Sequence, residues 1–553
     1  MFLFIKIILE REKVKSKGQK IDTMKRCSYT WKQWDRKRGD NVIQCSEETW
    51  EGSGEFCIFH DPSPEKDADL FKKMLKEQMQ TETRIHRFIG YHFPRNWDFS
   101  GNEFGFNVYF NGASFGEDAS FSKASFQRSA DFSDVTFQGD ANFRGATFQK
   151  AKFSGTVFYR KADFNNVTFQ EDVDFSNTTF QKDVDFYKAT FQEIKFNFSN
   201  FHENADFNQA VFQKNVNFYK ITFHSAIFNR VIFQEDVNFG EAVFQEDVDF
   251  NEAIFRGRAS FYNTIFHREA CFWGVTFESH SCFNFAAFQG DADFWGANFR
   301  EVEFSGSIFH KNAKFRDVAF QGDADFKAVI ARESFDLVSK QVSSILDFRG
   351  AKFFFVGSVT ANLKKARFYR THLQNVAFVN CSWPKNSIIY EEKEMKDTGI
   401  SFKELETIYR DLKRNMQNHG DHSKAGEFYY REMEMRRKGA AKIRERLGFK
   451  VYKSLAGYGE RYWNTAAISG FIILFFAFLY GISDCLQYSI VNPCLYQEIV
   501  DVVYFSFVTF TTLGLGDITP LTTLGKILIC LEAVIGAFMI ALFVVVFVRK
   551  MAR

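Results

Sequence analysis

Phenylalanine recurs along the middle of the chain with a spacing that mostly alternates between five and six residues. The run extends from Phe104 to Phe326 and begins with Phe104, Phe110, Phe115, Phe121 and Phe126. Neither the 3.6-residue period of an amphipathic helix nor the two-residue period of a half-buried strand fits this spacing. It is typical of a square coil in which each Phe points to the axis. The pattern therefore predicts stacked coils with phenylalanine ladders, about ten coils in this run.

Three further features refine this prediction. A small or β-branched residue usually lies two positions before each Phe, such as Ala141 before Phe143, and we expect it to point inward as well. Every second repeat has an extra residue, often Gln after Phe, which we expect to bulge at one corner. The ladder is interrupted near residues 329–346 and is followed by a degenerate tail: Phe353, Leu363, Phe368, Leu373 and Phe378.

The chain holds 73 phenylalanines and only six prolines, an imbalance that an ordinary mixed core does not need. Through its Phe spacing the chain resembles the pentapeptide-repeat family, which implies a right-handed quadrilateral β-helix.

Some acidic members of that family resemble DNA and bind topoisomerase. Here the net charge is only +2 and basic residues alternate with acidic ones, so we expect no nucleic-acid partner. A rigid scaffold, with or without a protein partner, is the favoured role. Because no catalytic constellation interrupts the ladder, we expect no enzyme.

Two later stretches are long and apolar enough to cross a membrane, Thr465–Ile482 and about Leu524–Val548. Trp463 and Tyr480 lie near the ends of the first, where aromatic side chains suit the interfaces. Lys and Arg cluster before the first stretch and after the second, whereas the Ser483–Thr523 loop contains neither. Positive segments stay inside, so we expect a multi-pass cell-membrane protein with both termini in the cytosol and this loop outside.

The loop contains an apolar, hydroxyl-rich segment, Tyr504–Thr511, that is too short to span a membrane. It leads into Thr512, Leu513, Gly514, Leu515, Gly516 and Asp517. These residues resemble the signature of two-transmembrane potassium-channel pore domains, a pore helix followed by Thr-Val-Gly-Tyr-Gly-Asp. The resemblance implies that they form a re-entrant selectivity filter whose carbonyl oxygens replace the hydration shell of potassium. Alternate residues then need left-handed backbone angles, which Gly514 and Gly516 adopt at little cost.

Two residues depart from that signature. Leu513 replaces the usual Val, and Leu515 replaces a Tyr whose hydroxyl braces the filter. Some potassium channels with two pore domains also carry Leu at the latter position, so a potassium-selective pore and a mixed potassium/sodium pore both remain open. The competing interpretation of the whole module is a plain two-span membrane anchor.

Other residues of the module are candidates for supporting roles. In similar channels a glycine at the position of Gly536 is the inner-helix hinge, and close helix packing is the alternative. Glu532 is expected behind the filter. Cys485 and Cys494 lie in the outer loop, where we consider a disulfide within a chain or between neighbouring chains.

Cys27, Cys45, Cys57 and His60 precede the repeat. Three thiolates and an imidazole can close a tetrahedral zinc site, and the alternative is a loop-rich cap with unligated cysteines. An amphipathic helix is predicted over Asp67–Gln80, where we expect it to cover the end of the solenoid, since solenoids need caps.

After Pro384 the pattern changes to that of helices. Ser401–Glu404 is a capping box, and it precedes a helix with an apolar face made of Leu405, Tyr409, Leu412 and Met416. Gly420 breaks this helix, and a second helix follows and runs into a basic stretch from Arg436 to Lys453. A packed adaptor, a gating lever and a peptide-binding groove all fit this hairpin.

These patterns divide the chain into five parts: an N-terminal extension (1–24), a Cys/His cap with a capping helix (25–98), the β-helix (99–381), a helical connector (382–462) and the pore domain (463–553). One chain provides one filter strand, so conduction needs a homotetramer. We therefore expect a tetrameric potassium-selective channel with a cytosolic β-helix. The alternative is a membrane-tethered scaffold with a degenerate pore.

Overall fold

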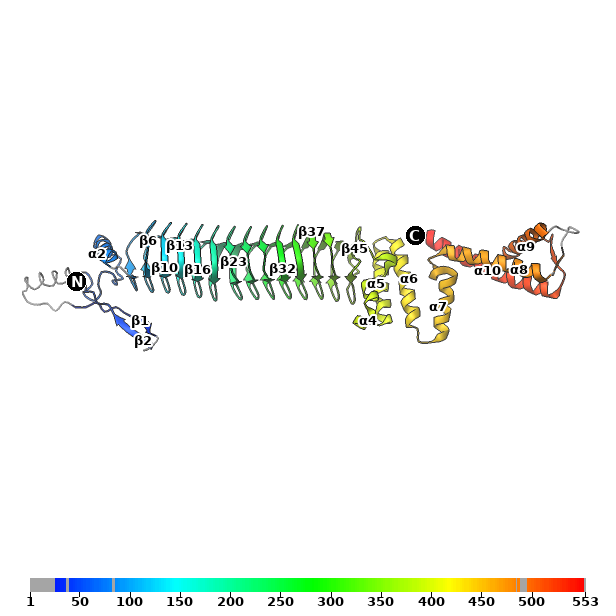
Figure 1. Cartoon of the computed structure of the whole chain (residues 1–553), viewed down its shortest axis with the longest axis horizontal. Helices are drawn as coiled ribbons and strands as arrows, with labels where there is room; N and C mark the ends of the chain where they lie inside the picture. Colours follow the sequence, from blue (N-terminus) through cyan, green and yellow to red (C-terminus); the bar gives the residue numbers. More distant parts are fainter. Residues whose placement is uncertain (1–24, 36–38, 82–84, 484, 488–494, 552–553) are drawn as a thin grey trace, which may run out of the picture. The chain divides into compact units, whose positions relative to one another are not determined.

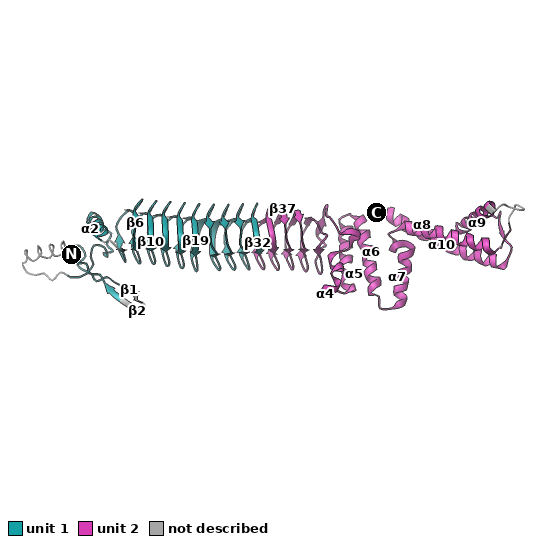
Figure 2. Cartoon of the chain, in the orientation of Figure 1, with its two compact units in different colours: residues 1–282 teal, residues 283–553 magenta. Residues whose placement is uncertain are grey.

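The structure is a computed structural model that describes residues 25–35, 39–81, 85–483, 485–487 and 495–551 (Figure 1). The chain divides into two compact units, residues 1–282 and residues 283–553 (Figure 2). The N-terminal extension (1–24) lies outside the described residues.

Square coils make up most of the first unit and the beginning of the second. Their strands run from β3 (Ile85–Arg87) to β45 (Val376–Phe378), and the coils amount to about 13 turns. Strands one coil apart pair in parallel, as in the register of Phe104 with Phe126 and of Phe126 with Phe148. The predicted β-helix is thus confirmed. It has more turns than expected because coils also form before Phe104 and after Phe326.

Phenylalanine rings fill the axis of the coils in continuous columns. Phe110, Phe132 and Phe153 are fully buried, and their ring centroids follow one another at 4.7 and 5.0 Å with nearly parallel planes. Neighbouring columns meet edge to face, as at Phe121 and Phe132, whose planes cross at 90°. Such offset-stacked and T-shaped pairs are the favoured aromatic geometries. Ala130, two residues before Phe132, is also fully buried, which confirms the inward position of the small residue.

The extra residue of the repeat bulges as predicted. β10 (Ser125–Asp131) pairs with β13 (Thr147–Lys152), and the register shifts between Phe126 and Ser129. The next pair, β13 with β16 (Thr168–Asp174), shifts at the corresponding place. The bulge lets a coil of 21 or 22 residues keep its phenylalanines in register.

The prediction that the ladder is interrupted near residues 329–346 is wrong. β39 (Ile330–Ala331), β40 (Phe335–Val342) and β41 (Leu346–Asp347) continue the coils through this region. Ala331 pairs with Phe309 on one side and with Phe353 on the other, and Leu337 pairs with Phe315. Both Ala331 and Leu337 are fully buried. The ladder tolerates smaller apolar side chains at single positions because backbone pairing to the coils on either side is unchanged.

The N-terminal cap consists of an antiparallel hairpin, β1 (Thr30–Asp35) and β2 (Gly39–Gln44), and a helix, α2 (Ala68–Thr81). Phe71 and Leu75 are the buried residues of α2. The Phe71 ring lies edge-on to Phe93 and to Trp97 of the first coils, at 5.5 and 5.1 Å. The amphipathic helix therefore packs against the N-terminal coils.

Helices follow the last coil: α3 (Tyr390–Lys393), α4 (Met395–Thr398), α5 (Phe402–Asn418) and α6 (His422–Gly439). Ser401 and Glu404 form the predicted capping box of α5, and its predicted apolar face is buried. The second helix runs into the basic stretch as expected, with Arg436, Arg437 and Lys438 in its last turn. It ends at Gly439, because Ala440 has extended backbone angles. The later basic residues Arg444, Arg446, Lys450 and Lys453 lie on a separate helix, α7 (Ile443–Ala456).

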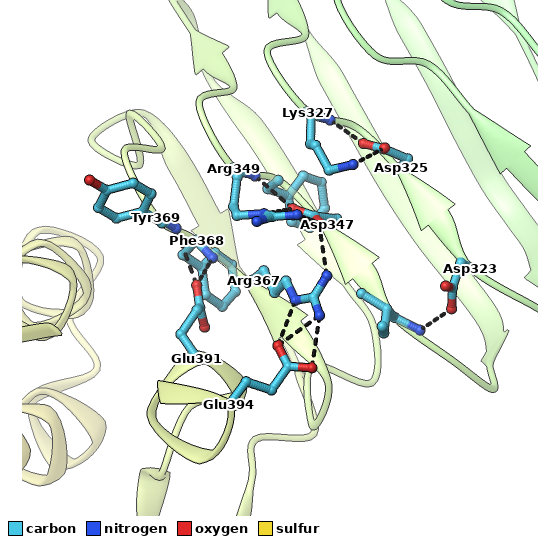
Figure 3. Close-up of polar contacts among 12 residues, drawn as sticks. Asp323, Asp325, Lys327, Asp347, Arg349, Arg367, Phe368, Tyr369, Glu391 and Glu394 are labelled. Carbon is cyan, nitrogen blue, oxygen red and sulfur yellow. Dashed lines mark hydrogen bonds and ion pairs between the residues drawn. The ribbon is translucent and has the colours of Figure 1, made fainter. Parts of the chain in front are cut away.

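The last coils are joined to α3 and α4 by buried charges (Figure 3). Arg367 lies between Asp347, at 3.3 Å, and Glu394 of the helical segment, at 2.7 Å. Glu391 accepts hydrogen bonds from the backbone N–H groups of Phe368 and Tyr369 and is almost fully buried. Burial, together with the nearby Asp347 carboxylate, raises the pKa of Glu391 to about 7, although the N–H donors act in the opposite direction.

We expect this junction to weaken as pH rises. The folded state favours the uncharged carboxyl, so stability is fully present below the ordinary pKa of 4.5 and is lost as pH rises through about 7. Between about pH 5.5 and about pH 8.5 the stability of the junction should fall by about 2 kcal/mol. Hydrogen exchange of the Phe368 and Tyr369 amides, corrected for the intrinsic exchange rate, measures this fall as reduced protection. Glu391→Gln should remove this pH dependence, whereas Glu333→Gln, at an exposed position, should leave it unchanged. If Glu391→Gln kept the pH dependence of the wild type, the dependence could not come from the Glu391 carboxyl.

Candidate functional site

The C-terminal module contains three helices: α8 (Tyr462–Ser483), α9 (Leu495–Phe510) and α10 (Thr523–Met551). α8 and α10 are long and apolar enough to cross a membrane, with mean hydropathies of 2.1 and 2.7. α9 is shorter and lies between them in the sequence, and it extends further toward the N-terminus than the segment Tyr504–Thr511 predicted from the sequence. Two spanning helices flank a short apolar helix, which is the arrangement expected of a re-entrant loop.

A shared apolar core holds α9 against both long helices. Phe476 and Tyr480 of α8 and Val502 and Phe505 of α9 are buried in one cluster with Ile518, which follows the Thr512–Asp517 segment. Leu528 and Ile529 of α10 pack against this cluster. Strand β46 (Leu486–Gln487) pairs with β47 (Thr519–Pro520). The segment from Thr511 to Asp517 is therefore fixed at both of its ends.

Alternate residues of this segment have left-handed backbone angles. The φ angles are 58° at Thr512, 56° at Gly514 and 79° at Gly516. This alternation turns successive carbonyl groups toward the same side of the strand, as a row of ion ligands requires. The sequence indicated the two glycines. It did not indicate Thr512, because a β-branched residue rarely adopts a positive φ.

All residues from Thr512 to Asp517 are exposed in the single chain. Leu513 and Leu515 expose 62% and 64% of their surface, although their side chains are apolar. The Tyr504 hydroxyl of α9 donates to the Asp517 carboxylate at 2.8 Å. This bond ties the outer end of the strand to its own helix, while the rest of the strand has an open face.

Glu532 of α10 lies at the centre of a buried hydrogen-bond network. Its side chain is fully buried and accepts from the Tyr480 hydroxyl of α8, at 2.7 Å, and from the Ser506 hydroxyl of α9. Ser506 also lies 2.8 Å from the Ile473 carbonyl of α8. One carboxyl group thus joins all three helices, and its partners were not apparent from the sequence. Its place behind the filter stays a prediction.

Replacing Glu532 with leucine is expected to destabilise the module by about 2–3 kcal/mol per chain, because the buried Tyr480 hydroxyl loses its acceptor. Glu532→Gln keeps an acceptor oxygen and should cost much less. Thermal denaturation of the purified protein in detergent measures both effects. Equal stability of wild type and Glu532→Leu would contradict the role of the network.

Gly536 permits a close approach of α10 to the end of α9. A Cβ atom at this position would lie 2.1 Å from the Phe510 carbonyl oxygen, so the glycine has a packing role, and its role as a hinge stays a prediction. Cys485 is buried, whereas Cys494 lies outside the described residues. The disulfide between them therefore also stays a prediction.

One face of α9 is left uncovered by the residues that the structure describes. Ile499, Val500, Val503, Tyr504 and Phe507 line an apolar surface on this helix, and Ile499 and Phe507 expose more than half of their area. The opposite face packs in the core of the module. A helix that is apolar all round is normally buried all round, so this face lacks a partner.

The C-terminal end of α10 is held by the connector. Arg549 lies 3.6 Å from the Glu460 carboxylate, and Lys550 lies 3.9 Å from it. The Arg549 guanidinium also covers the Tyr429 ring of α6, 4.8 Å from its centroid. Contacts between charged and aromatic groups thus link α6 and the connector directly to the end of α10.

The four residues predicted to bind metal come together in the N-terminal cap. Cys27, Cys45, Cys57 and His60 are all buried, and their ligand atoms lie within 4.8 Å of one another. The first and the last of them, Cys27 and His60, are 33 positions apart in the sequence, and the fold of the cap brings all four to one point.

Comparisons with known families agree with this architecture. The family model for pentapeptide repeats (9 copies) matches residues 99–147, 143–190, 186–232 and 228–276. The family model described as ion channel matches residues 468–553. No curated protein and no solved structure matches the chain. The chain thus combines pentapeptide repeats with a two-transmembrane ion-channel domain, and both resemblances found in the sequence are confirmed.

Proposed function

We propose that this chain, which joins a pentapeptide-repeat solenoid to an ion-channel domain, forms a homotetrameric potassium-selective channel in the cell membrane. The observation that carries the proposal is the alternation of left-handed angles at Thr512, Gly514 and Gly516. It places a row of carbonyl groups on a strand held between a short helix and a spanning helix.

Two exposed features support a tetramer. One chain contributes one row of carbonyls, and encircling an ion takes several rows around an axis, four in a closed cyclic assembly. The apolar face of α9 and the leucines at 513 and 515 are uncovered in the chain. Neighbouring subunits would cover both when the four strands meet at the axis.

Carbonyl ligands and the Tyr504–Asp517 hydrogen bond support potassium as the transported ion. The bond at 2.8 Å holds the outer end of the strand and limits its collapse onto a smaller ion. Leu515 offers no hydroxyl for a further brace, and a mixed potassium/sodium pore is the alternative for this reason.

We place the solenoid, the connector and the C-terminus in the cytosol. The basic residues of α7 and the Arg549–Lys550 pair at the end of α10 favour this orientation. Gating input then reaches α10 from the N-terminal side, through the junction at Arg367 and Glu394 and through the contacts of Glu460 and Tyr429 with Arg549.

Ion flux into liposomes that contain the purified full-length protein tests the proposal. We expect potassium flux to exceed sodium flux and barium, a doubly charged ion of similar size to potassium, to block it. Equal sodium and potassium flux would show that the pore is a mixed potassium/sodium pore and not a potassium-selective one. A folded tetramer without flux under any gating condition would favour the second candidate, a membrane-tethered scaffold whose exposed solenoid binds a protein partner.

A further inference from the structure

We infer that Cys27, Cys45, Cys57 and His60 form a structural zinc site that fastens the N-terminal cap to the first coil. All four side chains are at least 93% buried. The cluster lies in the first unit, and nothing in the channel proposal depends on it. Buried cysteines can also be ordinary apolar side chains, so the inference rests on the geometry of the ligand atoms and on what surrounds them.

The distances between the ligand atoms fit a tetrahedral metal. Zinc bonds of about 2.3 Å to sulfur and about 2.0 Å to nitrogen place ligand atoms about 3.5–3.8 Å apart. The Sγ atoms of Cys45 and Cys57 are 4.0 Å apart. The Nδ1 atom of His60 lies 3.1 Å from the Cys57 Sγ and 3.6 Å from the Cys27 Sγ. Small adjustments of side-chain angles would bring all four atoms to bonding distance.

The histidine already has the tautomer that metal binding needs. Its Nε2–H donates to the Ile89 carbonyl at 2.9 Å, so Nδ1 carries the lone pair in the neutral ring and faces the three sulfurs. A second nitrogen hydrogen-bonded to a carbonyl is the usual outer contact of a zinc-bound histidine. Because Ile89 follows β3, this same bond connects the site to the first coil.

Aromatic packing completes that connection. The Tyr29 ring stacks on the His60 imidazole at 4.0 Å, and Tyr91 of the first coil meets the imidazole edge-on at 5.2 Å. A Cβ atom on Gly90 would lie 1.9 Å from the Tyr29 hydroxyl, so the cap rests directly on the backbone of the coil at this glycine.

The loop that carries two of the ligands is itself held by a buried cation. The Lys66 ammonium donates to the carbonyls of Ile58, at 3.0 Å, and of Asp61, at 2.9 Å. A zinc ion with three thiolates and one neutral imidazole has a net charge of −1, and its binding releases the protons of the thiols. Lys66 supplies a positive charge that acts on Cys57, and the Asp61 carboxylate is a charged neighbour of Lys66.

Elemental analysis of the full-length protein, purified in detergent without added metal, tests the inference. We expect about one zinc per chain, and about one-tenth of that or less in Cys57→Ser. Cys381→Ser, outside the cluster, should keep full zinc content. Exchange of zinc for cobalt in the wild type should give the intense visible bands of a tetrahedral thiolate site, and this readout does not depend on the folding of any variant.

A second measurement tests the fastening role. Removing zinc with a chelator should increase the rate of proteolysis between residues 25 and 66 at least tenfold, and adding zinc back should restore protection. Metal-free protein whose cap resists proteolysis as well as the zinc-loaded protein does would overturn the inference. So would a disulfide between Cys45 and Cys57, seen as a loss of two hydrogens by mass spectrometry.

Discussion

Replacing Gly514 with alanine is expected to abolish selective potassium conduction. The φ angle at Gly514 is 56°, and a Cβ atom disfavours this left-handed angle by about 1–2 kcal/mol per residue. In a tetramer the cost applies to all four strands at once, so it amounts to about 4–8 kcal/mol. Relaxation to a right-handed angle would turn the carbonyl row away from the axis and remove an ion site.

The substitution tests backbone geometry and not side-chain packing, since among the described residues, its two chain neighbours aside, no atom lies within 4 Å of the new Cβ. Gly470→Ala is the matched control. It lies within α8, its new Cβ also meets no atom within 4 Å, and its φ is not positive. Potassium and sodium flux into liposomes, with the oligomeric state checked by gel filtration, measures both variants. Full potassium-selective flux through Gly514→Ala would refute the filter assignment.

Replacing Phe244 with alanine should destabilise the solenoid by about 3–5 kcal/mol, because it opens a cavity in a closely packed column. Phe244 is fully buried, and its ring lies between those of Phe223, at 5.3 Å, and Phe266, at 5.2 Å. Solenoid coils contact only their neighbours, so the loss cannot be redistributed over a wider core.

Gln245→Ala is the control for this prediction. Gln245 is adjacent to Phe244 but exposed, and its substitution should change stability by less than about 0.5 kcal/mol. Denaturant unfolding followed by the circular dichroism of the β-sheet compares the two variants. Similar midpoints would show that the ladder phenylalanines do not carry the stability of the coils.

The sequence alone determined the β-helix and the two spans. A coil of four short sides places the same side chain at the axis every five or six residues, so the spacing of Phe104, Phe110 and Phe115 implies the architecture without knowledge of any contact. The spans follow in the same way from the length and hydropathy of continuous segments. The capping box at Ser401 depends on residues three positions apart, so it too could be predicted locally.

Features that depend on distant partners became visible only in the folded chain. Ala331 and Leu337 continue the ladder because neighbouring coils supply backbone pairing, which a local count of phenylalanines cannot show. Glu532 accepts a hydrogen bond from Tyr480, which is 52 positions earlier in the chain. The positive φ of Thr512 opposes its own preference, so it too depends on the surrounding structure. Local patterns define elements, whereas burial and long-range hydrogen bonds arise only when those elements pack together.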